Sequence, residues 1–258
     1  MEFYPGFPIE VQRNPLGFCY ADDVFGPKPE VRRLCDIRSS LQDPNCSGPE
    51  ELYAIVMDVG LKQDRERICA CNLLFGAVTY AAGTIGKEPV RSQGHIHAVS
   101  PSCGMSTPEV YEIWEGEAII YMQQFGEDDP GNCYVVHAKA GEMVIVPPNW
   151  VHATINADVT RNMTFGAWCV RDYGFEYQAV RRHHGIAYFP QIENNQLIWN
   201  PNPAYHDSKL IVKNARTYQD FQLEPGVPIY TQFQQQKEKF LFVSRPMEYP
   251  EFWKDYQP

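Results

Sequence analysis

Short apolar segments separated by turn residues fill the middle of this chain and constrain its fold more than any other feature. They run from about residue 52 to residue 170 and are rich in β-branched and aromatic residues, which favour strands. Turn residues gather at 83–86, 126–132 and 140–141. The segments that we predict as strands are 52–59, 68–81, 89–98, 109–123, 133–138, 143–146, 152–156 and 163–170. Many short strands with regular turns predict an all-β sandwich or barrel.

The two ends of the chain differ from this middle part. Residues 1–50 are rich in Pro and Gly, and apolar residues at helical spacing from Pro29 to Leu41 predict one helix there. Residues 191–258 have weak periodicity, with a predicted strand at 240–243 and a short helix at 251–256. Several large aromatic residues in this segment argue against a disordered tail: Trp199, Phe221, Phe233, Phe240, Phe242 and Trp253. We therefore expect an N-terminal arm (1–50), a barrel (51–190) and a C-terminal extension (191–258) that packs on the barrel or on a partner subunit.

Charge and composition narrow the class of partner. The formal net charge is −10, which argues against a nucleic-acid partner because phosphate backbones attract clustered Lys and Arg. The first residues lack the basic and apolar regions of a secretory signal, and no stretch approaches the roughly 20 apolar residues of a membrane span. The eight cysteines are scattered, and we interpret them as reduced thiols. We therefore expect a cytoplasmic protein without a membrane partner.

Two histidines, His95 and His97, stand one residue apart. Residues i and i+2 of a strand point to the same face, so the two imidazoles are expected to project together. Glu109 begins a later predicted strand with Tyr111 on its face, and His152 follows a Pro-Pro-Asn turn. Three imidazoles and one carboxylate suit Fe(II), Mn(II), Zn(II) or Ni(II). From these residues alone, the alternative to a metal site is that His95 and His97 form a polar patch on the exposed face of a strand.

The spacing of this set resembles both signature motifs of the cupin family. The first motif reads His-x-His, a short gap, Glu, six residues and Gly, and its matches here are His95, His97, Glu109 and Gly116. The second reads Gly, five residues, Pro-x-Gly, two residues, His, three residues and Asn, and its matches are Gly141, Pro147, His152 and Asn156. The resemblance implies a cupin fold, which is a double-stranded β-helix or jelly-roll barrel.

The chain departs from the cupin pattern at two places. Asn149 replaces the glycine of the second motif, and Asn is the residue that next best tolerates left-handed backbone geometry. The gap between His97 and Glu109 holds eleven residues, where the family usually has three or four. We expect these extra residues to form a loop at the mouth of the barrel. The six-residue interval to Gly116 selects Glu109 rather than Glu112 as the ligand.

Longer runs resemble one group of cupins, the cupin-type glucose-6-phosphate isomerases. These runs are SQGHIH, PEVYEIWEGEA, VPPNWVHATIN and RDYGFEY, and the resemblance covers about residues 50–190. It implies metal ligands at His95, His97, Glu109 and His152. It implies that Ser92, Gly94 and a hydroxyl on the preceding strand, for which Thr79 is nearest, hold the substrate phosphate. It further implies a sugar pocket lined by Tyr53, Tyr111 and Tyr173, with Arg171 where the family often has His.

The resemblance predicts an enzyme, a metal-dependent aldose–ketose isomerase that interconverts glucose 6-phosphate and fructose 6-phosphate. Fe(II) or Mn(II) is the expected metal, with Zn(II) and Ni(II) as alternatives. Glu109 is the expected base for the C2 proton and Tyr111 the expected carrier of the hydroxyl proton; a metal-promoted hydride shift is the rival route. The group also leads us to expect a homodimer.

Three other functions compete with this one. The substrate of the isomerase could be another hexose with an anionic C6 group, such as a sulfonated sugar or mannose 6-phosphate, which Arg171 and the long loop would accommodate. A cupin oxygenase would use the same four ligands around Fe(II). A sugar-sensing module would bind a sugar phosphate without turnover, but the sequence has no helix-turn-helix or basic segment to go with it.

Overall fold

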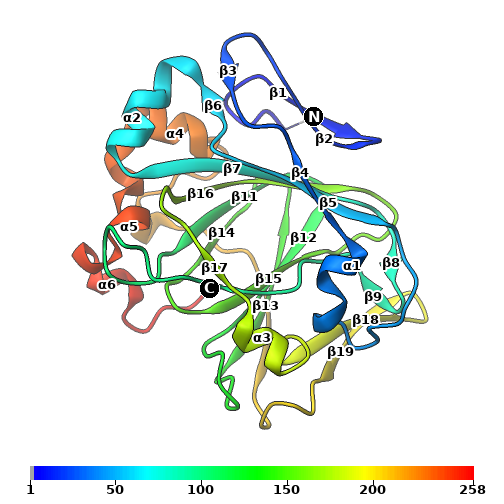
Figure 1. The fold of residues 1–258 in the computed structure, drawn as a ribbon. Helices are drawn as coiled ribbons and strands as arrows, with labels where there is room; N and C mark the ends of the chain where they lie inside the picture. The colour runs from blue at the N-terminus through cyan, green and yellow to red at the C-terminus, as the bar shows by residue number, and fades with distance from the viewer. Residues whose placement is uncertain (1–2) are drawn as a thin grey trace.

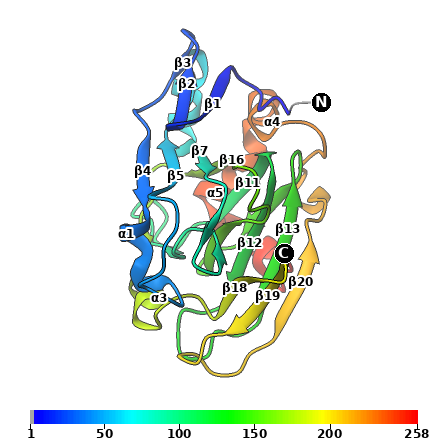
Figure 2. The ribbon, with the colours of Figure 1, turned by 90° about the vertical axis from the view of Figure 1, so that its right-hand side faces the viewer.

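The computed structural model describes residues 3–258 and places most strands in two sheets that face each other (Figures 1 and 2). One sheet has the order β14-β11-β16-β7-β5-β4, with bounds Met143–Val146, Glu109–Glu115, Met163–Val170, Leu73–Tyr80, Glu51–Met57 and Glu30–Arg33. The other has the order β15-β12-β13-β20, with bounds Val151–Asn156, Glu117–Gln123, Cys133–Lys139 and Leu210–Asn214. Neighbours are antiparallel except β13 and β20. The predicted all-β cupin barrel is confirmed.

Smaller elements surround these sheets. The other strands are β1 (Ile9–Arg13), β2 (Leu16–Tyr20), β3 (Val24–Phe25), β6 (Gly60–Leu61), β8 (Thr84–Ile85), β9 (Glu88–Pro89), β10 (Ile96–His97), β17 (Phe175–Glu176), β18 (Tyr188–Glu193) and β19 (Gln196–Pro201). The α-helices are α1 (Leu34–Ile37), α2 (Arg65–Ala70), α3 (Gln178–Arg182), α4 (Ile229–Gln235), α5 (Leu241–Ser244) and α6 (Pro250–Trp253). Short 3-10 turns lie at Arg38–Ser40, Lys62–Asp64, Gln219–Phe221, Lys237–Phe240 and Pro246–Glu248.

The central strands β7 and β16 of the six-stranded sheet are buried on both faces, and β7 shows how its sequence achieves this. All eight of its residues are buried. Successive side chains of a strand alternate between faces, so Leu74, Val78 and Tyr80 join the core between the sheets. Phe75 and Ala77 point outward into a second core. A continuous apolar run, rather than an alternating one, is the expected pattern for such a strand.

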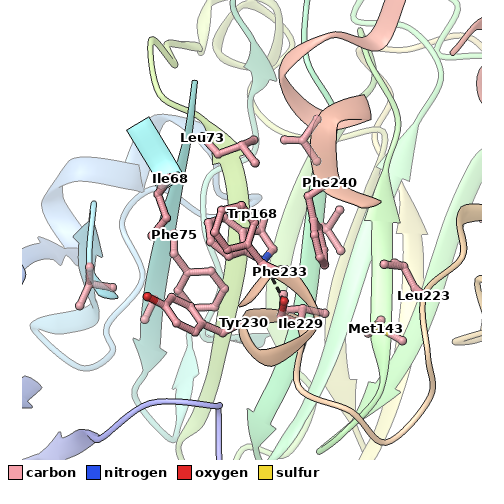
Figure 3. Close-up of a cluster of buried hydrophobic side chains, with 14 of the residues drawn as sticks. Ile68, Leu73, Phe75, Met143, Trp168, Leu223, Ile229, Tyr230, Phe233 and Phe240 are labelled. Atoms are coloured by element: carbon pink, nitrogen blue, oxygen red, sulfur yellow. Dashed lines mark hydrogen bonds between the residues drawn. The ribbon is translucent and has the colours of Figure 1, made fainter. Parts of the chain in front are cut away.

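The outward-facing core packs the C-terminal helices against the barrel (Figure 3). Trp168 of β16 is fully buried at its centre, with the rings of Phe233 and Tyr230 of α4 at centroid distances of 4.5 and 5.7 Å. The Trp168 indole N–H donates to the carbonyl of Ile229, 3.2 Å away. Figure 1 shows α4 and α5 along this side of the barrel, close to α2. The segment beyond residue 218 thus covers the barrel of its own chain.

Both flanking segments also contribute strands to the sheets. β4, from the N-terminal part, extends the six-stranded sheet by pairing with β5. β20, from the C-terminal part, forms the edge of the four-stranded sheet, beside β13 (Figure 2). The boundaries at residues 50 and 190 stay a prediction, but the sheets themselves extend beyond them.

One helix prediction and one strand prediction were wrong, because contacts with distant parts of the chain overrode the local pattern. The helix expected from Pro29 starts only at Leu34, because residues 30–33 pair with β5 as a strand. The strand expected at 240–243 is helical instead, as part of a 3-10 turn and α5 that pack on the outer core. Short apolar runs are ambiguous between helix and strand, and tertiary contacts decide between the two.

Three strand predictions needed different bounds. The segment 68–81 starts as α2 and becomes a strand only at Leu73. The segment 109–123 is two strands, because Gly116 turns the chain with a φ of +76°. The segment 89–98 pairs only at its ends and through two isolated bridges.

All eight cysteines are free. Within residues 3–258, every helix is too short or too polar to cross a membrane.

A buried carboxyl group, Glu112, joins the barrel to the C-terminal segment. It points away from Glu109, as expected from strand alternation, and its side chain accepts the backbone N–H of Ile229 (2.9 Å) and the indole N–H of Trp114 (3.3 Å). Burial raises the pKa of Glu112 to about 8, against 4.5 for an ordinary Glu. Between these two pH values the folded state therefore holds a proton that the unfolded state has lost.

This proton makes the stability of the protein depend on pH. Because the folded pKa is the higher one, the contribution of Glu112 is complete below about pH 4.5 and declines by about 1.4 kcal/mol per pH unit toward pH 8. We expect Glu112→Gln, which stays neutral, to flatten the fall in free energy of unfolding over this range. Urea unfolding at a series of pH values measures the slope. Glu115→Gln, at the partly exposed end of the same strand, should keep the wild-type slope. Equal slopes in Glu112→Gln and the wild type would contradict the assignment.

Candidate active site

Three histidines converge at one end of the barrel interior. His95 and His152 are joined by two backbone hydrogen bonds of 3.0 and 2.9 Å, which set β10 beside β15. His97, in β10, pairs with Phe175 of β17. One ring nitrogen from each histidine lies within 4.8 Å of those of the other two. Distances of this kind allow all three imidazoles to bind one metal ion.

The ring nitrogens of these histidines are arranged as metal ligands require. Nδ1 of His97 lies 2.8 Å from the carbonyl of Thr107, and Nδ1 of His152 lies 3.3 Å from that of Trp150. A carbonyl partner places the proton on Nδ1 and leaves the lone pair on Nε2. The Nε2 atoms of His95, His97 and His152 are all buried without a hydrogen-bond partner. Burial lowers the pKa of His95 and His152, which keeps both rings neutral. The donor set therefore fits a transition metal.

Glu109 brings a carboxylate to the same place. It is the first residue of β11 and is buried, and its Oε2 lies 3.2 Å from Nε2 of His97 and 3.7 Å from Nε2 of His152. The Tyr111 hydroxyl donates to Oε2 (2.7 Å), and the Cys169 thiol donates to Oε1 (3.0 Å). Burial alone would raise the pKa of Glu109, but its contacts with His152 and His97 outweigh this and hold the pKa well below its usual value. Glu109 is thus an ionised carboxylate beside three open imidazole nitrogens.

A pocket lies against this cluster, inside the barrel. Its walls are mainly aromatic and apolar, with a few hydroxyl groups and one guanidinium. The residues that line it include His95, Glu109, Tyr111, Ser92, Gln93, Thr154, Val78, Tyr80, Tyr53, Phe165, Ala167, Phe175, Tyr177 and Arg32. Burial and the Glu109 carboxylate raise the pKa of Tyr111 well above its usual value, so its hydroxyl is a proton donor at neutral pH. Concave, mostly apolar sites with few placed polar groups are typical of small-molecule pockets.

Comparison with known proteins assigns the family. The family model for glucose-6-phosphate isomerase (GPI) matches residues 34–207, which is more than half of the chain. The chain belongs to this family. The glucose-6-phosphate isomerase of Thermococcus litoralis is 26% identical over 184 residues, and that of Pyrococcus furiosus is 28% identical over 184 residues. Each match covers 70% of this chain and 90% of the relative.

Membership of the GPI family confirms the predicted family and the prediction of an enzyme of the sugar-phosphate isomerase class. Among solved structures, an oxalate oxidase is similar at 16% identity with a TM-score of 0.36, covering 48% of this chain and 54% of that one. A likeness this weak adds nothing to the assignment. The residues of the site therefore have to be judged from their own contacts.

Three of the predicted substrate contacts line the pocket of this GPI-family chain. Tyr111 stands beside Glu109, and Tyr53 lies farther along, with its ring stacked on Tyr80 at 4.8 Å between centroids. Ser92 also lines the pocket, and its hydroxyl accepts the backbone N–H of Thr154 at 3.0 Å. Their roles in binding stay predictions.

Two predicted contacts are corrected by the structure. Thr79 points out of the pocket, because the side chains that face inward from β7 are those of Val78 and Tyr80. Its hydroxyl instead accepts a hydrogen bond from Thr164 on the neighbouring strand, at 2.9 Å. Arg171 makes two hydrogen bonds to the carboxylate of Asp58, at 3.0 and 2.7 Å, and does not line the pocket. Both terminal nitrogens of its guanidinium are thus engaged, while its buried Nε has no partner.

Tyr173 and Gly94 lie at the edge of the site without lining the pocket. Tyr173 is 39% exposed and packs on Phe175, with ring centroids 5.2 Å apart. Gly94 immediately precedes His95 and has a φ of +91°. A Cβ atom at Gly94 would lie 2.9 Å from Cγ2 of Ile186. Gly94 is therefore required for the path of the histidine strand, whatever its contact with substrate.

Sequence reasoning missed several pocket residues. Tyr80 had a usable signal, since it lies two residues from Val78 on one strand face, and Thr154 lies two residues from His152 in the same way. Arg32 had none, because it comes from a segment outside the motifs. Tyr177 ends the run RDYGFEY and was not singled out within it. Cys169 was also missed, although its thiol contacts the Glu109 carboxylate.

The long loop between His97 and Glu109 supports the histidine cluster. The carbonyl of Thr107, near the end of this loop, faces Nδ1 of His97 at 2.8 Å. The hydroxyl of Ser106 accepts the backbone N–H of Asn149 at 2.9 Å. Asn149 has a φ of +68°, which confirms that it takes the left-handed geometry of the glycine that it replaces. The loop therefore connects the two motif turns.

Replacing Gly94 with alanine is expected to disturb the cluster without touching a ligand. The new Cβ would crowd Ile186 and force the histidine strand to move, so we expect metal affinity to fall about tenfold or more. Gly104→Ala is the matched control: Gly104 also has a positive φ (+71°), but nothing lies within 4 Å of the added Cβ. It should show only the conformational cost of about 1 kcal/mol. Metal titration and thermal unfolding separate the two effects, and equal metal affinity in both variants would refute this account.

Proposed function

We propose that this chain is a metal-dependent aldose–ketose isomerase that interconverts glucose 6-phosphate and fructose 6-phosphate. The observation that carries the proposal is the set of three buried, unpartnered Nε2 atoms beside the Glu109 carboxylate. Membership of the GPI family and the names of the relatives from Thermococcus litoralis and Pyrococcus furiosus support the choice of substrate.

His95, His97, His152 and Glu109 would hold the metal. Three nitrogen donors and one carboxylate oxygen suit Fe(II) or Mn(II) best, with Zn(II) and Ni(II) as alternatives. A divalent metal held there would act as a Lewis acid that polarises a carbonyl group and stabilises developing negative charge. The backbone pairing of His95 with His152 would keep the ligands in place during turnover.

Glu109 and Tyr111 would move the protons. In the open-chain sugar, one proton passes from C2 to C1 and another passes between the two oxygens. Glu109 is the carboxylate nearest to the pocket and would take the C2 proton. Tyr111 donates to Glu109 at 2.7 Å, so its hydroxyl could exchange a proton with the substrate oxygens next to the base. Phe175 and Tyr177 would help to keep water away from the reacting carbons.

A solvent-isotope experiment separates this proton-transfer route from a hydride shift. Turnover in D₂O should place deuterium on the sugar carbon if Glu109 exchanges its proton with solvent between the two transfers. A hydride shift would move the original hydrogen directly and leave the product carbon undeuterated. NMR of the product gives the answer.

The proposal also includes a homodimer in the cytoplasm. All eight cysteines are free, which suits a reducing compartment. Light scattering of the purified protein would measure the mass of the assembly, and a mass of about 30 kDa would contradict the dimer.

The test of the proposed function starts from purified protein reloaded with Mn(II) or Fe(II). Glucose 6-phosphate is supplied, fructose 6-phosphate is read by a coupled assay, and a chelated sample serves as the control. We expect turnover that disappears with the chelator. A sample that holds metal but is inactive would contradict the choice of substrate, and mannose 6-phosphate and sulfonated hexoses would be tested next. Oxygen consumption by the same sample would favour an oxygenase instead.

A further inference from the structure

One wall of the pocket contains a cation that the chemistry of the metal site does not use. Arg32 lies on β4, in the N-terminal part of the chain, and pairs with Tyr53 of β5. Arg32, Tyr53 and Tyr177 all line the pocket. Among the described residues that line it, Arg32 is the only Lys or Arg. The pocket therefore has one permanent positive charge, at a place that the family motifs do not mark.

The guanidinium of Arg32 is available for a ligand. Its one ion pair is with Glu30, at 3.2 Å, and the side chains of Arg32 and Glu30 are 35% and 66% exposed. Exposed pairs of this kind contribute about 0–1 kcal/mol, so an anion in the pocket could replace Glu30 at little cost. Arg171, by contrast, is held by two hydrogen bonds to Asp58. Of these two cations, Arg32 is the one that lines the pocket.

A continuous series of rings connects the metal-binding end of the pocket to Arg32. Ring centroids are separated by 6.4 Å from His152 to Tyr111, 4.8 Å from Tyr111 to Phe165, 6.2 Å from Phe165 to Tyr80 and 4.8 Å from Tyr80 to Tyr53. Tyr53 is the cross-strand partner of Arg32. The histidine cluster and Arg32 therefore lie at opposite ends of one aromatic wall.

The opposite wall is shorter. Phe175 packs on His95, with centroids 4.5 Å apart, and Tyr177 lies 6.3 Å from Phe175 and 5.9 Å from His95. Burial raises the pKa of both Tyr53 and Tyr177, and the charge of Arg32 opposes the rise in each case. The two phenol groups and the guanidinium are therefore near neighbours at this end of the pocket.

The middle of the pocket offers no charge to an anion. Val78, Phe165 and Ala167 are apolar, and Ser92 and Gln93 offer only neutral polar groups. An anion without a positive partner is costly to bury. A substrate that places its reacting carbons at the metal ligands therefore gains a cationic partner if its anionic end extends toward Arg32.

We propose that Arg32 binds the phosphate monoester at the end of the sugar distant from the reacting carbons, with the hydroxyls of Tyr53 and Tyr177 beside it. This rests on the proposed function, since it concerns the same pocket and a sugar phosphate as substrate. It adds a cationic contact from the N-terminal strand β4 to the neutral ones expected from Ser92 and Gly94. Arg suits this role because its planar group donates two parallel hydrogen bonds to phosphate oxygens.

The first test uses the full-length, metal-loaded protein with glucose 6-phosphate as substrate. Arg32→Gln should raise KM by about 10- to 150-fold, the range for losing hydrogen bonds to a charged group, and should lower kcat by less than about fivefold. Arg32→Lys keeps the charge and should recover part of the loss. Arg33→Gln is the matched control, because Arg33 is the next residue of the same strand and pairs with Glu50 in an exposed contact at 3.3 Å. Its KM should equal that of the wild type.

The second test measures binding without turnover, by calorimetry with 6-phosphogluconate and gluconate. The wild type and Arg33→Gln should bind the phosphorylated acid at least tenfold more tightly, and Arg32→Gln should lose this preference. If the wild type is inactive but still prefers the phosphorylated acid, and Arg32→Gln loses this preference, the isomerase proposal is contradicted. The proposed role of Arg32 in binding phosphate is then supported independently. An unchanged KM and preference in Arg32→Gln, or a wild type with no preference for phosphate, would overturn the role of Arg32.

Discussion

Replacing His152 with alanine is expected to remove both bound metal and turnover. His152 is 1% exposed, and its Nε2 lies with those of His95 and His97 in a space free of hydrogen-bond partners. Loss of one imidazole leaves the metal with too few donors for tight binding. Because the metal supplies several kcal/mol of charge stabilisation, we expect kcat/KM to fall by about 10³-fold or more. Elemental analysis of the purified variant gives the metal content, and the coupled assay gives the activity.

The control for this experiment is a histidine of the same barrel outside the site. His137, on β13, is partly buried and faces neither the cluster nor the pocket. His137→Ala should therefore keep both metal and turnover. Thermal unfolding of both variants will show whether the barrel is intact. Full turnover of His152→Ala without metal, or stoichiometric metal in that variant, would refute the assignment of the ligands.

The histidine cluster could be predicted because its geometry is local. His95 and His97 are two residues apart, and the short strand that carries them points both rings the same way. The intervals to Glu109 and His152 match a known pattern, and both residues begin or follow turns that fix where the next strand starts. Despite the long loop, Glu109 lies beside the histidines, whereas Glu112 faces the outer core.

The far end of the pocket could not be predicted, because it depends on pairing between segments distant in sequence. Arg32 reaches the pocket only because residues 30–33 extend the sheet beside β5, and the local pattern had predicted a helix there. Thr79 was named as the nearest hydroxyl on its strand, but neighbouring residues of a strand point to opposite faces. Val78 and Tyr80 take the inner face instead.

Replacing Trp168 with alanine is expected to produce the largest loss of stability of any single substitution considered. Trp168 is fully buried between β16 and the C-terminal helices, with Phe75, Phe233 and Tyr230 around it (Figure 3). Such aromatic-to-alanine changes cost about 3–5 kcal/mol. Trp168→Phe keeps a ring in place and loses the hydrogen bond to Ile229, so it should cost less, about 1–2 kcal/mol. Urea unfolding gives both values.

The same experiment tests whether the C-terminal segment and the metal site fold together. β16 carries Trp168 on its outer face, and the next residue, Cys169, donates to Glu109 on the inner face. A loss of packing around Trp168 should therefore also disturb Glu109, because β16 carries both Trp168 and the Cys169 thiol that contacts Glu109. In metal-loaded Trp168→Ala, we expect release of metal and loss of tryptophan fluorescence to follow a single transition at lower urea than in the wild type. Two separated transitions, with the metal retained through the first, would contradict this coupling and make the C-terminal segment an independent unit.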